Sequence, residues 1–281
     1  MASGTAMTSR SAARPLVVER PCRSILHATR AGFAEYTLNV YQGCAFGCAY
    51  CYVPVLRRRR NQPSPGGWGE WVEVKTNAPD ALRREMQRVP ADARIAIGTA
   101  ADSWQPVERR YGLARAVLEE LASYPNKVHI VTRSPLLLRD VDVLRRMASV
   151  EVAVSLSGFD DEARRAFEPR APTVSARERL IRGLLDGGIP VDLFWCPLLP
   201  GISDTMAAVD RTLARAAELG VRRVFAGRLS YARELGGAYA AAIARIPRGG
   251  QDPRNRWLHP VELRERAALW SRRTGMPIHV E

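Results

Sequence analysis

The sequence predicts an α/β protein in which parallel strands alternate with helices. Short runs rich in β-branched residues recur along the chain. The segments between these runs carry apolar residues at intervals of three and four, as one face of a helix does. Such alternation implies parallel strands joined by right-handed crossovers. Periodicity alone leaves a barrel and a doubly wound sheet open.

Six apolar runs are expected to form the strands of this sheet. They cover residues 37–41, 94–99, 128–132, 150–156, 191–195 and 221–226. The segment Trp71–Lys75 alternates apolar and polar residues and is expected as a short extra strand. Residues 57–67 combine a run of arginines with turn-forming residues and are expected to form a loop.

Start and stop signals place the helices between these strands. Ser175 and Glu178 have the spacing of a capping box, and the helix that they begin is expected to end at residues 187–188, both glycine. Ser203 or Asp204 is expected to begin another helix that runs to Gly220. A further helix is predicted by apolar residues at helical spacing: Val107, Tyr111, Ala114, Leu118 and Leu121.

The composition is that of an average globular protein. Of the 281 residues, 46% are hydrophobic and 25% are charged, which excludes a disordered, collagen-like or disulfide-scaffold chain. No apolar run approaches the ~20 residues that cross a bilayer, so no membrane association is expected. The first residues include arginines but no apolar stretch of a secretion signal, and a cytoplasmic location is therefore expected.

The net charge is strongly positive. Lys and Arg number 42 and Asp and Glu 29, which gives +13. This balance favours an anionic partner such as nucleic acid. Only Lys75 and Lys127 are lysines, however, and the codon usage of a GC-rich genome explains an arginine excess equally well. Charge alone leaves a nucleic-acid partner open.

Five cysteines occur in the chain, and Cys44, Cys48 and Cys51 lie within eight residues. An odd number without a secretion signal argues against a disulfide framework. Structural zinc takes four protein ligands, and no further cysteine pair or nearby histidine completes such a set. Three thiolates with a vacant fourth position suit an iron–sulfur cluster that leaves one iron open. The alternative is a zinc-stabilised, non-enzymatic nucleic-acid-binding protein that uses the arginines at 57–60.

The CxxxCxxC spacing of Cys44, Cys48 and Cys51, with Tyr50 before the last cysteine, resembles the signature of the radical S-adenosylmethionine (SAM) superfamily. The wider string 39–52, NVYQGCAFGCAYCY, resembles its spore photoproduct lyase-like branch. The resemblance implies a partial (β/α)6 TIM-like barrel with the cysteine loop after the first strand. The chain is then expected to divide into a flexible extension (1–30), the barrel (31–235) and a C-terminal helical segment that packs on the barrel (236–281).

The same resemblance implies the activity. Cys44, Cys48 and Cys51 would hold three irons of a 4Fe–4S cluster, and SAM would chelate the fourth. The reduced cluster would cleave SAM to a 5′-deoxyadenosyl radical, which abstracts hydrogen from a substrate that the sequence does not identify. Nucleic acid is one candidate substrate. An external one-electron donor of the ferredoxin or flavodoxin type would be needed.

Barrels of this kind carry their chemistry at the C-terminal ends of the strands. By resemblance, Tyr50 would contact the adenine and Arg133 would clamp the SAM carboxylate. Asp102 would accept hydrogen bonds from the SAM amine or, alternatively, cap the following helix. Ser155 and Ser157 lie on one face of a strand and would contact the ribose or methionyl group.

Two residues are candidates for hydrogen transfer. Cys196 follows a predicted strand and would be a thiol within reach of the radical, or a small inert core residue. Tyr52 would relay a hydrogen atom or stack on adenine, or only pack on the cysteine loop. Spore photoproduct lyases carry a hydrogen-donating cysteine on the turn after the second strand, where residues 99–102 of this chain have none. The resemblance therefore does not extend clearly to repair of thymine dimers.

Overall fold

The computed structural model describes residues 14–30, 32–246 and 259–281. Its main element is an eight-stranded sheet in which seven strands are parallel and the edge strand β2 pairs antiparallel with β3. The strand order is β11 (Ile278–Val280), β10 (Val224–Arg228), β9 (Val191–Leu198), β8 (Ser149–Leu156), β7 (Lys127–Thr132), β6 (Arg94–Ile97), β3 (Tyr36–Leu38) and β2 (Leu26–Ala28).

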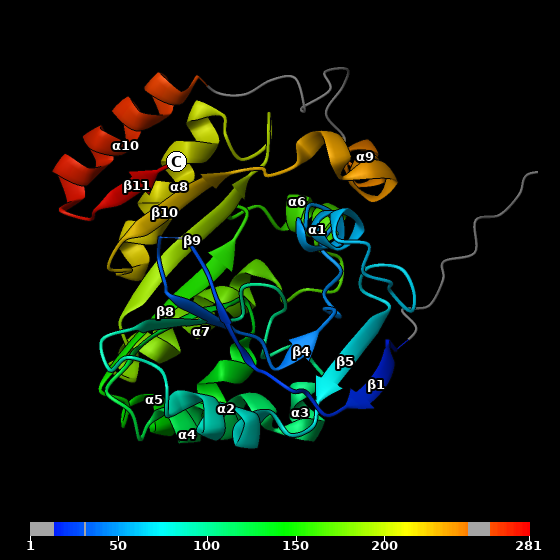
Figure 1. The fold of residues 1–281 in the computed structure, drawn as a ribbon. Helices are drawn as coiled ribbons and strands as arrows, with labels where there is room; N and C mark the ends of the chain where they lie inside the picture. Colours follow the sequence, from blue (N-terminus) through cyan, green and yellow to red (C-terminus); the bar gives the residue numbers. More distant parts are fainter. Residues whose placement is uncertain (1–13, 31, 247–258) are drawn as a thin grey trace, which may run out of the picture.

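Helices cover the outside of this sheet, which curves into an open, partial TIM-like barrel (Figure 1). The edge strands β2 and β11 do not pair with each other, so the barrel is not closed. The connecting helices include α2 (Ala78–Met86), α4 (Leu113–Leu121), α5 (Val141–Leu144), α7 (Val174–Asp186) and α8 (Met206–Leu219). Five of the six predicted strands are therefore confirmed as members of one parallel sheet, and the barrel is confirmed over the doubly wound alternative.

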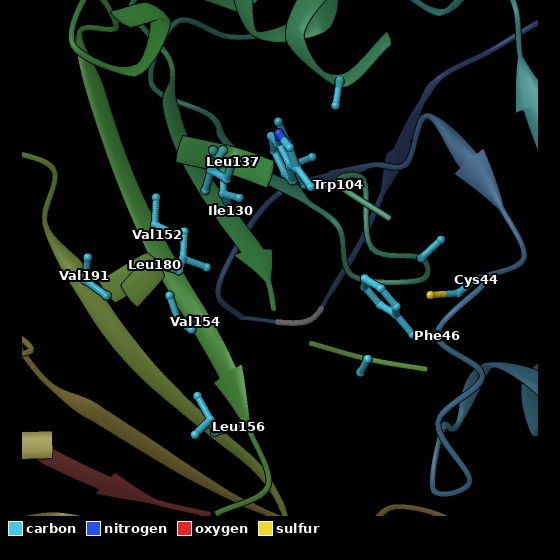
Figure 2. Packing of buried hydrophobic residues seen from close by; sticks show 14 of the residues in the cluster. Cys44, Phe46, Trp104, Ile130, Leu137, Val152, Val154, Leu156, Leu180 and Val191 are labelled. Carbon is cyan, nitrogen blue, oxygen red and sulfur yellow. The ribbon is translucent and has the colours of Figure 1, made fainter. Parts of the chain in front are cut away.

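The core lies between the sheet and these helices. Figure 2 shows Val152, Val154 and Leu156 of β8 in this core, and all three side chains are fully buried. The intervening residues of β8 are buried as well, since a parallel strand covered on both faces has no solvent side. This continuous burial holds β8 rigidly in place up to its C-terminal end.

The predicted strand 37–41 is wrong as one element, because the chain changes sheet within it. β3 ends at Leu38, and β4 (Tyr41–Gln42) pairs with β5 (Trp71–Lys75) in a second, three-stranded sheet with β1 (Leu16–Arg20). The side chain of Asn39 accepts hydrogen bonds from the backbone N–H groups of Ala100 and Ala101, at 2.9 and 3.3 Å. These bonds hold the backbone away from the regular ladder.

The described part of the expected N-terminal extension contains two strands. β1 pairs in parallel with β5 from Leu16 to Arg20, and β2 pairs with β3. Short edge strands carry too little periodicity to be recognised in the sequence. Residues 1–13, which belong to the same predicted extension, lie outside the described residues. The division into three regions stays a prediction.

The C-terminal segment contributes a strand as well as helices. Its helices are α9 (Gly236–Ala244) and α10 (Pro260–Thr274), and β11 then pairs in parallel with β10. The sheet thus gains a parallel strand beyond the six predicted. The region between α9 and α10 includes residues 247–258, which are not described.

Two helix starts and one loop were predicted wrongly. Thr173, not Ser175, caps α7, and Thr205 rather than Ser203 or Asp204 caps α8. In each case the threonine hydroxyl accepts the backbone N–H three residues later. Ser203 and Asp204 instead accept backbone N–H groups of the turn after β9. In the expected loop 57–67, the first residues complete helix α1 (Val53–Arg59). No helix of the described ranges is long and apolar enough to cross a membrane.

Candidate active site

The loop that carries the three clustered cysteines joins β4 to α1. Gly43 and Gly47 have φ values of +72° and +56°, the left-handed region that favours glycine. A Cβ at Gly43 would lie 2.5 Å from the carbonyl oxygen of Trp71. The loop therefore packs directly on β5 through a turn that only glycine can make.

Cys44, Cys48 and Cys51 are free thiols that line one cavity. Burial raises the pKa of all three, that of Cys51 to about 12, and the thiols are close enough to influence one another's charge. The unliganded site therefore holds neutral thiols at neutral pH. Binding of a metal cluster must release these protons.

The donor set fits a 4Fe–4S cluster. Three thiols share one cavity wall, with open space beside them for a ligand on the fourth iron. Within the described ranges, no three His, Cys, Asp or Glu side chains converge as the ligands of a single metal ion would. Arg133 supplies a cationic donor against Cys48, which complements the negative charge of bound thiolates.

The other walls of the cavity come from the C-terminal ends of the parallel strands, as in other barrels of this class. The loop after β6 contributes Gly98–Asp102, and the ends of β7 and β8 contribute Arg133 and Ser155. The ends of β9 and β10 contribute the remaining wall: Phe194, Cys196, Pro197, Gly227, Arg228, Leu229 and Ser230. Most of the predicted site residues thus line one cavity.

Arg133 is the centre of a buried polar network beside the cysteines. Its Nη1 donates to Cys48 Sγ and to the Tyr50 hydroxyl, both at 3.1 Å, and its Nη2 donates to Ser155 Oγ at 3.1 Å. Glu168 lies 3.3 Å from the same guanidinium. The side chain is held from several directions, so its position does not depend on a bound ligand.

Asp102 lines the cavity, but its carboxylate is already engaged. One oxygen accepts the backbone N–H of Trp104 at 2.9 Å and the Thr132 hydroxyl at 2.8 Å. The other accepts the backbone N–H of Arg133 at 2.9 Å. These contacts tie the turn after β6 to the end of β7. The following helix, α3 (Glu108–Tyr111), begins after Val107 without a side-chain cap, so Asp102 holds this turn and does not cap the helix.

Ser155 and Ser157 have different surroundings, although strand alternation places both on one face. Ser155 lines the cavity and accepts from Arg133. Ser157 is not among the cavity-lining residues, and its hydroxyl donates to Glu168 Oε1 at 3.1 Å. Burial opposes ionisation of Glu168, but the charges of Arg177 and Arg133 outweigh it and hold the pKa of this carboxyl well below its usual range.

The two tyrosines of the loop also differ. Tyr50 is buried, and its hydroxyl donates to Glu168. Tyr52 is partly exposed at the cavity mouth, and its hydroxyl donates to the carbonyl oxygen of Thr99 at 2.7 Å. Burial raises the pKa of Tyr52 to about 12, so its phenol keeps its hydrogen at neutral pH.

Cys196 lines the same cavity and belongs to β9, far from the cysteine loop in the sequence. Its thiol is 3.7 Å from the carbonyl oxygen of Phe225. A Cβ at Gly227 would lie 2.6 Å from this sulfur and 3.3 Å from the carboxylate of Glu281. Burial and the charge of Glu281 raise the pKa of Cys196, and the group is therefore a neutral thiol.

Sequence reasoning missed three residues at this site. Arg177 binds Glu168 from α7, Glu281 reaches the cavity after β11, and the indole of Trp68 lies against the cysteine loop. A signal existed for Arg177, because it falls on the same helical face as Ile181 and is buried with it. For Glu281 and Trp68 no local pattern exists, since their neighbours at the site are distant in sequence.

Comparisons with known proteins agree with this geometry. Residues 38–214 match the model of the radical SAM superfamily. Similar relatives include the uncharacterized protein MJ0683 of Methanocaldococcus jannaschii, 27% identical over 196 residues that cover 70% of this chain and 73% of the relative. Another is the uncharacterized protein Rv2578c of Mycobacterium tuberculosis, 32% identical over 211 residues that cover 72% of this chain and 62% of the relative. The chain thus spans less than two thirds of the mycobacterial protein.

Solved structures show the same fold. Spore photoproduct lyase complexed with dinucleoside spore photoproduct superposes with a TM-score of 0.69 at 14% identity, covering 94% of this chain and 82% of that chain. SuiB of Streptococcus suis superposes with a TM-score of 0.56 at 11% identity, covering 95% and 50%. Both identities are low, so these likenesses establish the fold alone.

The barrel, the cysteine loop and the cavity at the strand ends define an iron–sulfur enzyme that uses SAM. The chain belongs to the radical SAM superfamily, and within it resembles the spore photoproduct lyase-like branch. Its cofactors are a 4Fe–4S cluster and SAM, and it needs an external one-electron donor. This membership does not agree with the alternative of a zinc-stabilised, non-enzymatic protein.

Proposed function

We propose that this enzyme transfers hydrogen atoms to and from a substrate bound at the cavity mouth, with Cys196 as the hydrogen donor. The observation that carries the proposal is the presence of a neutral, half-buried thiol in the same cavity as Cys44, Cys48 and Cys51. When bound, the cluster and SAM supply a 5′-deoxyadenosyl radical that abstracts hydrogen from the substrate.

The residues of this chain have separate roles in that reaction. Arg133, Ser155 and Tyr50 bind and orient SAM. Asp102 and Ser157 act one step further out, because their polar atoms already hold Arg133 and Glu168 in place. Arg133 therefore clamps the SAM carboxylate, and Asp102 is a positioning residue.

Cys196 then gives its S–H hydrogen atom to the substrate radical, which forms a C–H bond in the product and leaves a thiyl. Tyr52, which lines the same cavity, passes its O–H hydrogen atom to that thiyl. One electron from the external donor and one proton from solvent restore the phenol. The raised pKa values of Cys196 and Tyr52 keep both hydrogens in place before reaction.

Solvent deuterium tests this role. Thiol and phenol hydrogens exchange with water, so turnover in D2O is expected to place deuterium in the wild-type product. Cys196→Ala is expected to keep dithionite-driven formation of 5′-deoxyadenosine within about twofold, while the product loses its deuterium. Unchanged deuterium content in this variant would show that another group donates the hydrogen.

For the substrate we propose nucleic acid. Helix α1 begins at the cavity mouth, where Tyr52 and Val53 line the cavity, and carries arginines at 57–60. Arg228 lies on the same rim, and the net charge is +13. The structural neighbour spore photoproduct lyase was solved with a dinucleoside photoproduct, which supports a nucleotide-sized substrate for this mouth.

The test compares 5′-deoxyadenosine formation by the reconstituted enzyme with and without single-stranded DNA or RNA oligonucleotides. Stimulation is expected with one class of oligonucleotide. Arg60→Glu, at the exposed end of α1, is expected to weaken oligonucleotide binding. The slope of the logarithm of the binding constant against the logarithm of salt concentration should fall in magnitude by about one. Arg146→Glu is the matched control, because Arg146 precedes β8 at the opposite end of the barrel. Equal effects of both variants would contradict a binding surface at α1.

A further inference from the structure

A groove lies on the outer side of the cysteine loop, away from the substrate cavity. Its apolar floor includes the accessible Pro106, Pro135 and Leu136 together with Phe46 and Trp104, whose side chains are almost fully buried. Three arginines surround it: Arg109, Arg139 and Arg170. None of the described residues that line the groove is an aspartate or glutamate. The groove is therefore apolar at its base and cationic at its rim.

One loop separates this groove from the cavity. Cys44 and Cys48 line the cavity, whereas Phe46, between them in sequence, lines the groove. Figure 2 labels Cys44 and Phe46 on this loop, with Trp104 nearby. A protein seated in the groove would thus approach the cysteine ligands across the thickness of a single loop, without entering the cavity where SAM and substrate bind.

The groove and the loop are joined by specific hydrogen bonds. Gln105, next to the groove residue Trp104, accepts the backbone N–H of Ala45 at 2.7 Å and donates to the carbonyl oxygen of Gly43 at 3.2 Å. Arg170 donates to the carbonyl oxygen of Gly69 at 2.6 Å, and its guanidinium also lies against Gly47. The rim of the groove is therefore in fixed position relative to the cysteines.

The arginines differ in how far their charge is already balanced. Arg139 pairs with the buried carboxylates of Glu108 and Asp140, at 2.8 and 2.7 Å. Within the part of the chain that the structure describes, the Arg170 guanidinium hydrogen-bonds only to a backbone carbonyl, which carries no net charge. Arg109 is exposed on α3 (Glu108–Tyr111) and makes no side-chain hydrogen bond or ion pair within the described residues. The groove thus presents uncompensated positive charge.

We propose that this groove docks an acidic one-electron carrier protein of the flavodoxin or ferredoxin class. The inference rests on the proposed class of electron donor. The reduced carrier loses one electron, and the cluster held by the cysteines gains it and passes from the 2+ to the 1+ state. An apolar floor with a charged rim is the usual anatomy of a protein interface and favours a protein over a nucleic acid, whose backbone offers no apolar surface to this floor. Complementary charge would speed the encounter.

Stopped-flow reduction of the reconstituted cluster by reduced flavodoxin tests the proposal, with dithionite as a small reductant that needs no docking site. Arg109→Glu is expected to slow reduction by flavodoxin about five- to tenfold at low salt, and Arg109→Gln by less. Both effects should fade at high salt. Reduction by dithionite and the resulting 5′-deoxyadenosine yield should not change. Arg146→Glu carries the same charge change at the opposite end of the barrel and should behave as wild type.

The outcomes separate this inference from the proposed function. Equal flavodoxin rates in Arg109→Glu and wild type would overturn the docking surface, even where Cys196 and the substrate behave as proposed. Loss of oligonucleotide binding in Arg109→Glu, with an unchanged flavodoxin rate, would assign the groove to nucleic acid and also overturn it. A third outcome is that Arg109→Glu slows reduction by flavodoxin while the deuterium experiment shows that Cys196 donates no hydrogen. This outcome would refute only the proposed function.

Discussion

The Nη1 atom of Arg133 lies 3.1 Å from Sγ of Cys48, although the two residues are 85 positions apart in the chain. The parallel sheet creates this contact, because β3 and β7 both pair with β6, so that the end of β7 lies close to the cysteine loop, which follows β3 and β4. The same guanidinium reaches Tyr50, Ser155 and Glu168. A single side chain thus connects the cysteine loop to the strand ends that would hold SAM.

Arg133→Lys tests this connection. Lysine keeps the charge but lacks the planar pair of nitrogens that reaches Cys48 and Ser155 together. Iron and sulfide content after reconstitution should stay near wild type, whereas SAM affinity should fall roughly tenfold or more, the loss of one charge-assisted hydrogen bond. The measurement is a SAM titration of the reduced cluster followed by electron paramagnetic resonance. An unchanged affinity would contradict the role of Arg133 as a carboxylate clamp.

The buried ion pair of Arg177 and Glu168 predicts a large effect on stability. Both side chains are almost completely inaccessible, with 1% and 0% exposure. Arg177→Met removes one of the positive charges that balance the buried carboxylate of Glu168. The free energy of unfolding of the apoprotein, measured in urea, should fall by about 3–5 kcal/mol. Arg179→Met, two residues along on the exposed face of α7, should change the free energy of unfolding by about 0.5 kcal/mol or less. Similar losses in both variants would mean that the pair contributes nothing specific.

Trp68 predicts an effect on the reduction potential. Its indole N–H is buried and makes no hydrogen bond of normal geometry to any residue that the structure describes. It is nevertheless close enough to Cys51 to oppose the burial that raises the pKa of that thiol. With the cluster bound, a donor at this place favours the more negative, reduced state. Trp68→Phe should therefore lower the midpoint potential by about 40 mV, the equivalent of ~1 kcal/mol for one electron.

A redox titration followed by electron paramagnetic resonance measures this potential. Trp71→Phe is the control, because Trp71 also has a buried indole N–H without a partner among the described residues but does not line the cavity. Its potential should match that of the wild type. A shift of the same size in both variants would indicate a general packing effect.

Glu151 predicts a loss of stability in acid. It lies near the start of β8, where Lys127, Arg222 and Arg223 surround it at 2.7–3.0 Å. Burial opposes its ionisation, but these cations outweigh burial and lower its pKa from 4.5 to about 2. The stabilisation is therefore complete above about pH 4.5 and is lost as the pH falls towards 2, because only the unfolded state takes up the proton in that range.

Urea unfolding of wild type and Glu151→Gln measures this contribution. The difference between them should be about 1–2 kcal/mol at pH 7 and should shrink below pH 4. Glu162→Gln, an exposed substitution on α6 (Asp161–Phe167), serves as the control and should match wild type at both pH values. A difference for Glu151→Gln that does not depend on pH would exclude the electrostatic explanation.

Much of the site was predictable because its signals are local. The spacing of Cys44, Cys48 and Cys51 lies within one loop, and the strands that position Arg133 and Ser155 are continuous apolar runs. The misplaced caps and the split strand arose from contacts that no local pattern reports. The side chain of Asn39 accepts hydrogen bonds from backbone N–H groups 61 and 62 positions away. Thr173 and Ser175 are both suitable N-cap residues, and the backbone conformation before α7 makes Thr173 the cap.

The sequence by itself determined the class of fold, most of the parallel strands of the barrel and the three cysteines of the cofactor loop, since each depends on residues close together in the chain. Only the tertiary structure decided which polar groups remain available. The carboxylate of Asp102 is hydrogen-bonded to backbone groups of the turn after β6 and the end of β7, and the hydroxyl of Ser157 is hydrogen-bonded to Glu168. Cys196 and Glu281 line the same cavity although they are distant in sequence. The physical reason is that a buried polar group must find a partner, and which partner lies within reach is set by packing rather than by sequence order.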